Sequence, residues 1–155
     1  MPLSPAQCLI QYWTSLGYVV KTGASEQSLR AFEARYQVLL PSDVREYFAL
    51  YGGFEGQANW DDYFIGFWPL ESVVRLSDED GEYMLPNSLG PSNTYFIIGD
   101  YLINSHFYAI QLTQDPSGSN AVVAYESYKF GDSFTAFVAI YLQNPELIAS
   151  PPLHN

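Results

Sequence analysis

The most informative stretch of the chain runs Leu40-Pro41-Ser42-Asp43-Val44-Arg45-Glu46-Tyr47-Phe48-Ala49-Leu50-Tyr51-Gly52-Gly53. Its apolar residues recur at i, i+3, i+4 and i+7 and therefore share one face of a helix: Val44, Tyr47, Phe48 and Tyr51. Pro41 and Ser42 predict the helix start, because a serine side chain there can accept a hydrogen bond from an unpaired backbone amide. Asp43 then lies at the positive end of the helix dipole. Gly52-Gly53 predicts the helix end, since glycine adopts left-handed backbone angles without steric cost.

Composition predicts one folded domain. The chain has 155 residues, of which 48% are hydrophobic and only 15% are charged. That length is sufficient for one core, and the composition excludes an intrinsically disordered protein. The chain also holds 13 Tyr, 10 Phe and 3 Trp. Most of these rings are expected in the core, and others at a binding surface, because Tyr and Trp are enriched at interface hot spots.

Negative charge is the second strong feature of the sequence. The net charge is −11, which argues against nucleic acid and anionic membranes as partners and suits a basic protein partner. The charge is concentrated between Glu55 and Glu82, whose eight acids and one base, Arg75, give a net −7. Residues 1–46 are neutral, with four bases and four acids.

The single cysteine, Cys8, excludes an intrachain disulfide and a zinc site built from several cysteines. The first residues carry no basic segment followed by an apolar run, so no signal peptide is expected. No apolar stretch approaches the ~20 residues needed to span a bilayer. These features together predict a cytoplasmic protein.

Two further helices are predicted before residue 40. Ser4 is the expected N-cap of the first helix, with Pro5 at its first position and Gln7 completing a capping box. The apolar stripe of that helix is Leu9, Ile10, Trp13 and Leu16, and Gly17 follows it. The second helix is expected from Ser25 to about Gln37, and its buried side is Leu29, Phe32 and Tyr36.

The second half of the chain has the pattern of a sheet followed by a helix. Strands are predicted over 63–68, 94–98, 106–112 and 121–126, a helical turn over 69–74, a loop over 77–93 and a hairpin connection over 115–120. Asp132 is the expected cap of a last helix that ends near Asn144-Pro145, with a stripe of Phe134, Phe137, Val138 and Tyr141. The chain is therefore predicted to be α+β, with one domain over 1–145 and a Pro-rich tail over 146–155.

Several short motifs along the chain resemble, in their order and spacing, the Smi/Knr family of the SUKH superfamily. They are Glu33 before Leu40-Pro41-Ser42-Asp43, then Gly52-Gly53, Phe67-Trp68-Pro69-Leu70, Ile97-Ile98-Gly99-Asp100, and Ser133-Phe134 through Tyr141-Leu142. Most proteins of this superfamily are bacterial immunity proteins that neutralise polymorphic toxins, and the Smi/Knr family also includes a yeast regulator of cell-wall synthesis. The resemblance thus implies protein binding, with either a toxin or an endogenous protein as the partner.

No set of residues in the sequence has the pattern of a catalytic or metal site. Catalysis by a nucleophile needs a base and an orienting group, and the only histidines are His106, at a predicted strand start, and His154, in the tail. Ser133 precedes a helix and is not part of a nucleophile elbow. The acidic run after Asp78 lacks the ligand spacing of a calcium-binding EF-hand. We therefore expect no enzyme activity, no cofactor and no metal.

The acidic, aromatic middle of the chain is the candidate binding site. Its residues are Glu55, Asn59, Trp60, Asp61, Asp62, Tyr63, Asp78, Glu79, Asp80 and Glu82. One interpretation is a solvated face that maintains solubility. The other is a surface that binds the basic cleft of a toxin, such as a nuclease, because carboxylates steer a basic partner and aromatic rings then anchor it. The leading hypothesis is an immunity protein; the alternative is a regulatory or scaffold module. The sequence leaves the oligomeric state open.

Overall fold

The computed structural model of the chain describes residues 2–56, 59–78, 91–102, 106–115, 119–124 and 128–149. Its α-helices are α1 (Pro5–Ser15), α2 (Glu26–Tyr36), α3 (Ser42–Leu50), α4 (Phe134–Gln143) and α5 (Pro145–Ala149). Its strands are β1 (Ile65–Phe67), β2 (Val74–Arg75), β3 (Tyr95–Tyr101), β4 (His106–Gln111), β5 (Val122–Ala124) and β6 (Tyr128–Lys129). Three short 3₁₀ turns are η1 (Leu70–Ser72), η2 (Leu76–Asp78) and η4 (Ser92–Thr94). This arrangement confirms the predicted α+β fold class.

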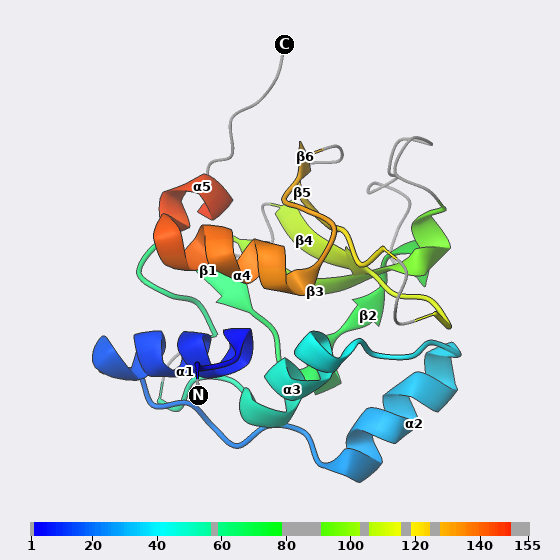
Figure 1. The fold of residues 1–155 in the computed structure, drawn as a ribbon, viewed down its shortest axis with the longest axis horizontal. Coiled ribbons are helices and arrows are strands. Elements are labelled where there is room, and N and C mark those ends of the chain that lie inside the picture. The colour runs from blue at the N-terminus through cyan, green and yellow to red at the C-terminus, as the bar shows by residue number, and fades with distance from the viewer. Residues whose placement is uncertain are drawn as a thin grey trace.

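The strands form one antiparallel sheet in the order β1-β3-β4-β5-β6, and β2 also pairs with β3. Strand β1 pairs with the last residues of β3, from Gly99 to Tyr101, whereas β2 pairs with Phe96 and Ile97 near its start. In Figure 1, α1, α2 and α3 lie together along the lower part of the view, with α4 and α5 above α1. The long strand β3 therefore carries two short partners at its two ends.

Alternation along the strands gives the sheet two apolar faces. Phe96, Ile98, Tyr108 and Ile110 point to the face that packs against the helices, and Tyr95, Ile97 and Ala109 belong to a smaller cluster on the opposite face. The helical stripe of the opening motif is buried as predicted, since Val44, Tyr47, Phe48 and Tyr51 are each at most 2% exposed. The stripe of α4 is buried too: Phe134, Phe137, Val138 and Tyr141.

Local capping explains where the first two helices begin. Ser4 and Gln7 form the predicted capping box of α1, and the Ser25 side chain accepts a hydrogen bond from the Ser28 amide at the start of α2. The last predicted stripe residue of α1, Leu16, is 47% exposed. The apolar stripe of α1 thus ends one turn earlier than predicted, at Trp13.

Three local predictions about helix ends are wrong. Helix α3 has Pro41 as its N-cap with no side-chain hydrogen bond, so Ser42 does not cap it. Its C-cap is Tyr51 in an extended conformation, so no left-handed glycine ends the helix. Gly52 instead lies against the chain at Thr22, whose carbonyl oxygen leaves no room for a Cβ. The cap of α4 is Ser133, not Asp132, because the Ser133 hydroxyl accepts from the Ala136 amide.

Several elements differ from the sequence prediction at their boundaries. Strand β1 begins only at Ile65, because Tyr63 and Phe64 lie in the turn before it. The short strands β2 and β6 were not predicted. Helix α5 covers residues that the prediction assigned to the tail, and the Tyr108 hydroxyl donates to the Ile148 carbonyl at 2.7 Å, so the packed domain extends to Ala149. The predicted loop over 77–93 and the tail from Ser150 lie largely or wholly outside the described residues.

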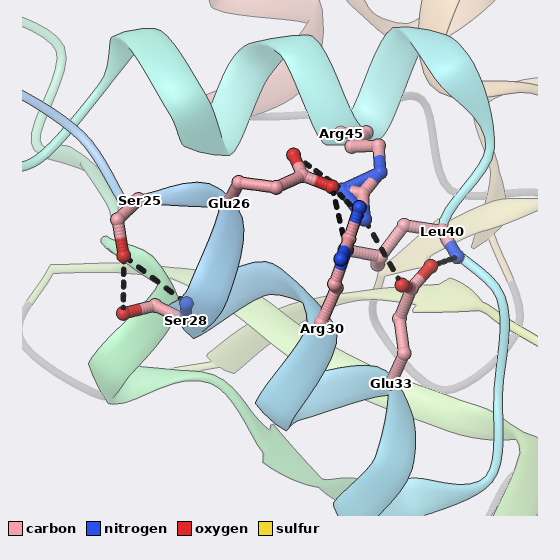
Figure 2. A network of polar contacts seen from close by, with 7 residues as sticks. All are labelled: Ser25, Glu26, Ser28, Arg30, Glu33, Leu40 and Arg45. Carbon is pink, nitrogen blue, oxygen red and sulfur yellow. Dashed lines mark hydrogen bonds and ion pairs between the residues drawn. The ribbon is translucent and has the colours of Figure 1, made fainter.

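The motif residues around Leu40 connect α2 to α3. One oxygen of Glu33 accepts the Leu40 amide at 2.8 Å, and the other pairs with Arg45 at 3.1 Å (Figure 2). Arg45 also pairs with Glu26 at 3.0 Å, and Arg30 binds the same glutamate. These side chains reach from both helices towards one another, so the charges of this region neutralise each other.

The Asp43 carboxylate links the same motif to the last helix. Its Oδ2 accepts hydrogen bonds from both the backbone amide and the hydroxyl of Thr135, at 3.0 and 2.8 Å. The opening motif thus contacts the start of α4, 92 residues away. No helix in the described part of the chain is both long and apolar enough to cross a membrane.

Candidate functional site

The structure separates the ten predicted partner-binding residues into different environments. Glu55, Asp62, Tyr63 and Asp78 are exposed, and Asn59 and Trp60 are half-buried. Glu79, Asp80 and Glu82 lie outside the described residues. Asp61 is buried, with 7% of its surface exposed. The candidate surface therefore consists of the exposed members of this set and of the residues that the fold places beside them.

Asp61 organises the turn that precedes β1. Its Oδ1 accepts hydrogen bonds from the amides of Tyr63 and Ile65 at 2.8 and 3.0 Å. Its backbone carbonyl accepts the Phe64 amide at 3.1 Å, and its own amide donates to the Ile65 carbonyl at 2.9 Å. Each amide from Tyr63 to Ile65 thus donates to Asp61. The prediction that this carboxylate faces a partner is wrong, because burial and these bonds direct it inward.

The second oxygen of Asp61 attaches the turn to the core. The Tyr141 hydroxyl donates to Oδ2 at 2.6 Å, and Trp13 Nε1 donates to the Tyr141 oxygen at 3.0 Å. Burial raises the pKa of the Asp61 carboxyl above its ordinary value, against the opposing effect of the Tyr141 hydrogen bond. This chain of hydrogen bonds joins α1, α4 and the turn, so the turn is held in one position relative to the domain.

The turn tip, defined as Asp62, Tyr63 and Phe64, projects outward from this anchor. Asp62 is exposed, Tyr63 is 37% exposed and Phe64 is 52% exposed. The Tyr18 hydroxyl donates to Asp62 Oδ1 at 2.5 Å, which positions the carboxylate. The tip therefore presents one carboxylate and two aromatic rings, and the backbone amides of Tyr63 and Phe64 are satisfied by Asp61.

Two residues of this region, Phe64 in the turn tip and Leu102 beside it, were not predicted as site residues. Leu102, just after β3, donates its amide to the Phe64 carbonyl at 3.1 Å, and its side chain is 44% exposed. Phe64 itself was assigned to a strand, and the Trp60 ring lies against it edge-to-face at 6.3 Å. The paired aspartates before Tyr63 were the one local signal of a turn; no local signal placed Leu102 beside it.

Glu55 lies on a second loop with an exposed apolar neighbour. Its amide donates to the Val19 carbonyl at 2.7 Å, and the Val19 side chain is 57% exposed. Asn59 has a structural role in the same region, because its side-chain oxygen accepts the Phe54 amide at 2.8 Å. Its carbonyl accepts the Phe67 amide at 2.7 Å, which attaches the loop to β1.

Asp78 is separated from the turn tip along β3. Strand β2 pairs with Phe96 through Arg75, three residues before Asp78, whereas the turn tip meets the chain at Leu102. Phe96 and Leu102 are six residues apart on an extended strand, a span of about 20 Å. The structure therefore brings Trp60, Asp62 and Tyr63 into one region and leaves Asp78 at the other end of β3. Glu55 is linked to this region because its amide binds Val19, the neighbour of Tyr18, whose hydroxyl binds Asp62.

Most of the positive charge has partners away from the turn tip, and the one remaining base is Lys21. All six Lys and Arg residues are described, and five of them have partners elsewhere. Those five are Arg30 and Arg45 with Glu26, Arg35 and Arg75 over the Tyr36 ring, and Lys129 with Asp132. Among the described residues, no cation lies within ion-pair distance of Glu55 or Asp62. The carboxylates of Glu55 and Asp62 thus keep their negative charge without an ion pair to any described residue.

His106, for which the sequence predicts no catalytic role, lies at the first position of β4. Its ring stacks on Tyr101 at 4.8 Å, and burial lowers the pKa of its imidazole against the opposing charge of Asp100. The described ranges contain no cluster of three or more His, Cys, Asp or Glu side chains able to hold a metal ion.

Comparison with protein families matches residues 23–140 to the model of the SMI1 / KNR4 family (SUKH-1). The chain belongs to this family. No curated protein matches the chain in a sequence comparison. The matched range of this SUKH-1 chain includes both the Glu33–Arg45 contacts and the turn tip. The family assignment agrees with the resemblance seen in the motifs and supports protein partners in general, without naming one.

Proposed function

We propose that this SUKH-1 chain is an immunity protein of the cytoplasm, which binds a toxin domain stoichiometrically and blocks it without turnover. The observation that carries the proposal is the turn tip: exposed rings and a carboxylate held on a backbone that Asp61 and Tyr141 fix from within. A preorganised tip loses little conformational freedom on binding, and exposed aromatic residues supply short-range affinity.

Charge supports a basic target such as a nuclease domain. The chain has a net charge of −11, and most of its cations are already paired or stacked within the fold. Carboxylates that remain near the turn tip accelerate encounter with a positively charged cleft. A basic cleft is also complementary to a surface whose aromatic rings are bordered by carboxylates.

The test uses the genes that adjoin the coding sequence of this chain. We expect one of them to encode a secreted protein with a toxic C-terminal domain, whose expression stops growth and whose effect the SUKH-1 chain reverses. Protection should require equimolar chain in a purified assay, because a binder acts once whereas an enzyme would act at a small fraction of the toxin concentration. His106→Ala should protect like wild type if it keeps the fold.

Other results would contradict the proposal. If no neighbouring gene encodes a toxin, or if the chain binds a non-toxic endogenous protein, the regulatory module of the same family becomes the correct function. Protection at a tenth of the toxin concentration, or its loss in a folded His106→Ala variant, would favour an enzyme.

A further inference from the structure

Two large apolar residues beside each other have an unusual backbone conformation. Among the described residues, the non-glycine residues with positive φ are Gln37, Phe64 and Leu102, at 55°, 64° and 47°. Gln37 is the polar C-cap of α2, a position where left-handed angles are common. Phe64 and Leu102 cap no helix, and the Leu102 amide donates to the Phe64 carbonyl. Their strained conformations therefore occur at one place in the fold.

The strain at these two positions is not explained by burial of their side chains. Left-handed angles are unfavourable for residues with a Cβ, and least so for Asn and Asp among non-glycine residues. Phe64 is 52% exposed and Leu102 is 44% exposed, so neither side chain occupies the core. Strained residues that persist in this way are concentrated at functional sites. An exposed Phe and an exposed Leu at strained positions thus suggest a role outside the folded core.

The fold holds both residues in place from the inside. Phe64 donates its amide to the Asp61 carbonyl, and the Trp60 ring lies edge-to-face against the Phe64 ring at 6.3 Å. Leu102 continues the antiparallel pairing of β1 with β3, one residue beyond the Ile65–Tyr101 pair. The two exposed side chains are therefore presented from neighbouring positions of the same ladder.

We propose that Phe64 and Leu102 form the apolar anchor of the interface and insert into an apolar pocket of a basic protein, bordered by Lys and Arg. This inference rests on the proposed function in one respect, that the partner is a protein. Charge complementarity selects the occupant, because Asp62 adjoins the anchor and the chain carries a net charge of −11. The same net charge opposes a second copy of this chain and an anionic membrane as occupants.

The first experiment tests whether Phe64 and Leu102 lower the stability of the folded chain. Phe64→Asn and Leu102→Asn should each raise the midpoint of thermal unfolding by about 2 °C, because Asn tolerates left-handed angles. The control is Leu39→Asn, since Leu39 is 45% exposed and has no positive φ. It should leave the midpoint unchanged. A fall of several degrees in both test variants would show that the side chains serve the fold, and would overturn the proposal.

The second experiment identifies the occupant. A photoreactive phenylalanine derivative replaces Phe64 in one variant and Leu39 in another, in the cells that encode the chain. We expect a crosslink to one basic protein from position 64 and none from position 39. That protein, once purified, should bind wild type at equimolar ratio, about 30-fold more weakly to Phe64→Asn, and unchanged to Leu39→Asn.

The remaining outcomes each decide against one proposal. A crosslink from position 64 to a second copy of the chain, to lipid, or to nothing would overturn the anchor. Equal affinity for wild type and Phe64→Asn would do the same and leave the immunity proposal standing. A crosslinked basic protein that is not toxic would retain the anchor and overturn the immunity proposal.

Discussion

The α2–α3 region and the turn before β1 use carboxylates in opposite ways. Between α2 and α3, Glu33 and Glu26 meet Arg45, so acids and bases neutralise each other (Figure 2). In the turn, Asp61 is buried, and backbone amides and Tyr141 satisfy it, with no cation paired to it among the described residues. The first arrangement stabilises the junction between α2 and α3. The second stabilises a short backbone segment whose other side chains point to solvent.

The comparison also explains why the family motif predicts the fold better than the partner. Glu33 accepts the Leu40 amide, and Asp43 accepts from Thr135, so these motif residues stabilise the junctions between helices. The exposed side chains of the turn tip do not stabilise junctions between helices. Different partners can therefore be accommodated on the same framework by changing exposed residues.

Removal of the Asp61 carboxylate should have the largest effect on the free energy of unfolding, and it tests whether this carboxylate anchors the turn. Asp61→Ala should lower the free energy of unfolding by about 3–5 kcal/mol, because two amides and the Tyr141 hydroxyl lose a buried charged acceptor. Asp62→Ala is the matched control and should change it by less than about 1 kcal/mol, since Asp62 is exposed. Urea unfolding followed by tryptophan fluorescence measures both. Equal effects of the two changes would mean that the turn is not anchored through Asp61.

Removal of the Glu33 carboxylate should have a smaller effect. Glu33→Ala leaves Arg45 paired with Glu26 and removes the acceptor of one part-buried amide, that of Leu40, so we expect a loss of about 1–3 kcal/mol. Arg30→Ala, at an exposed ion pair of the same network, should cost less than about 0.5 kcal/mol. The same unfolding assay applies. A loss for Glu33→Ala above that of Asp61→Ala would reverse the order of the two regions.

The different use of carboxylates in the two regions should also be seen in binding kinetics. Glu55→Gln combined with Asp62→Asn should slow association with a basic partner by about 3–10-fold and leave dissociation nearly unchanged, because exposed carboxylates act through long-range steering. Glu26→Gln should slow it much less, since Glu26 begins α2, which lies away from β1 and the turn before it (Figure 1). Association rates at low and high salt provide the measurement, and salt should reduce the difference from wild type. An association rate indifferent to salt would show that the acids near the tip only solvate the surface.

The smallest expected effect is a pH dependence that originates at Asp61. Burial raises its pKa in the folded chain above the ordinary value of 3.8, so the folded chain binds the proton more tightly than the unfolded chain. The stability from this group is complete below pH 3.8 and declines as pH rises through the folded pKa. Asp61→Asn does not titrate, so its stability relative to wild type should improve with rising pH. A difference that stays constant from acid to neutral pH would contradict the raised pKa.

Adjacent residues show where prediction from the sequence stops. Asp61 and Asp62 have the same side chain, and their sequence context predicts both at the binding surface. In the structure Asp61 is buried against Tyr141, 80 residues away, whereas Asp62 is exposed beside Tyr18. No local pattern distinguishes the two, because the difference depends on a contact between distant segments. The same holds for Leu102, which becomes a site residue only through its pairing with Phe64.

Features that depend on neighbours in the chain could be read from the sequence. The caps at Ser4 and Ser25, the buried stripes of α3 and α4 and the α+β order follow from periodicity and from short-range hydrogen bonds. The buried carboxylate, the left-handed Phe64 and the packing of α5 depend on long-range contacts, which determine where each polar group finds its partner. Local interactions set the elements; the packing of distant elements selects which of two identical side chains faces the core and which faces the solvent.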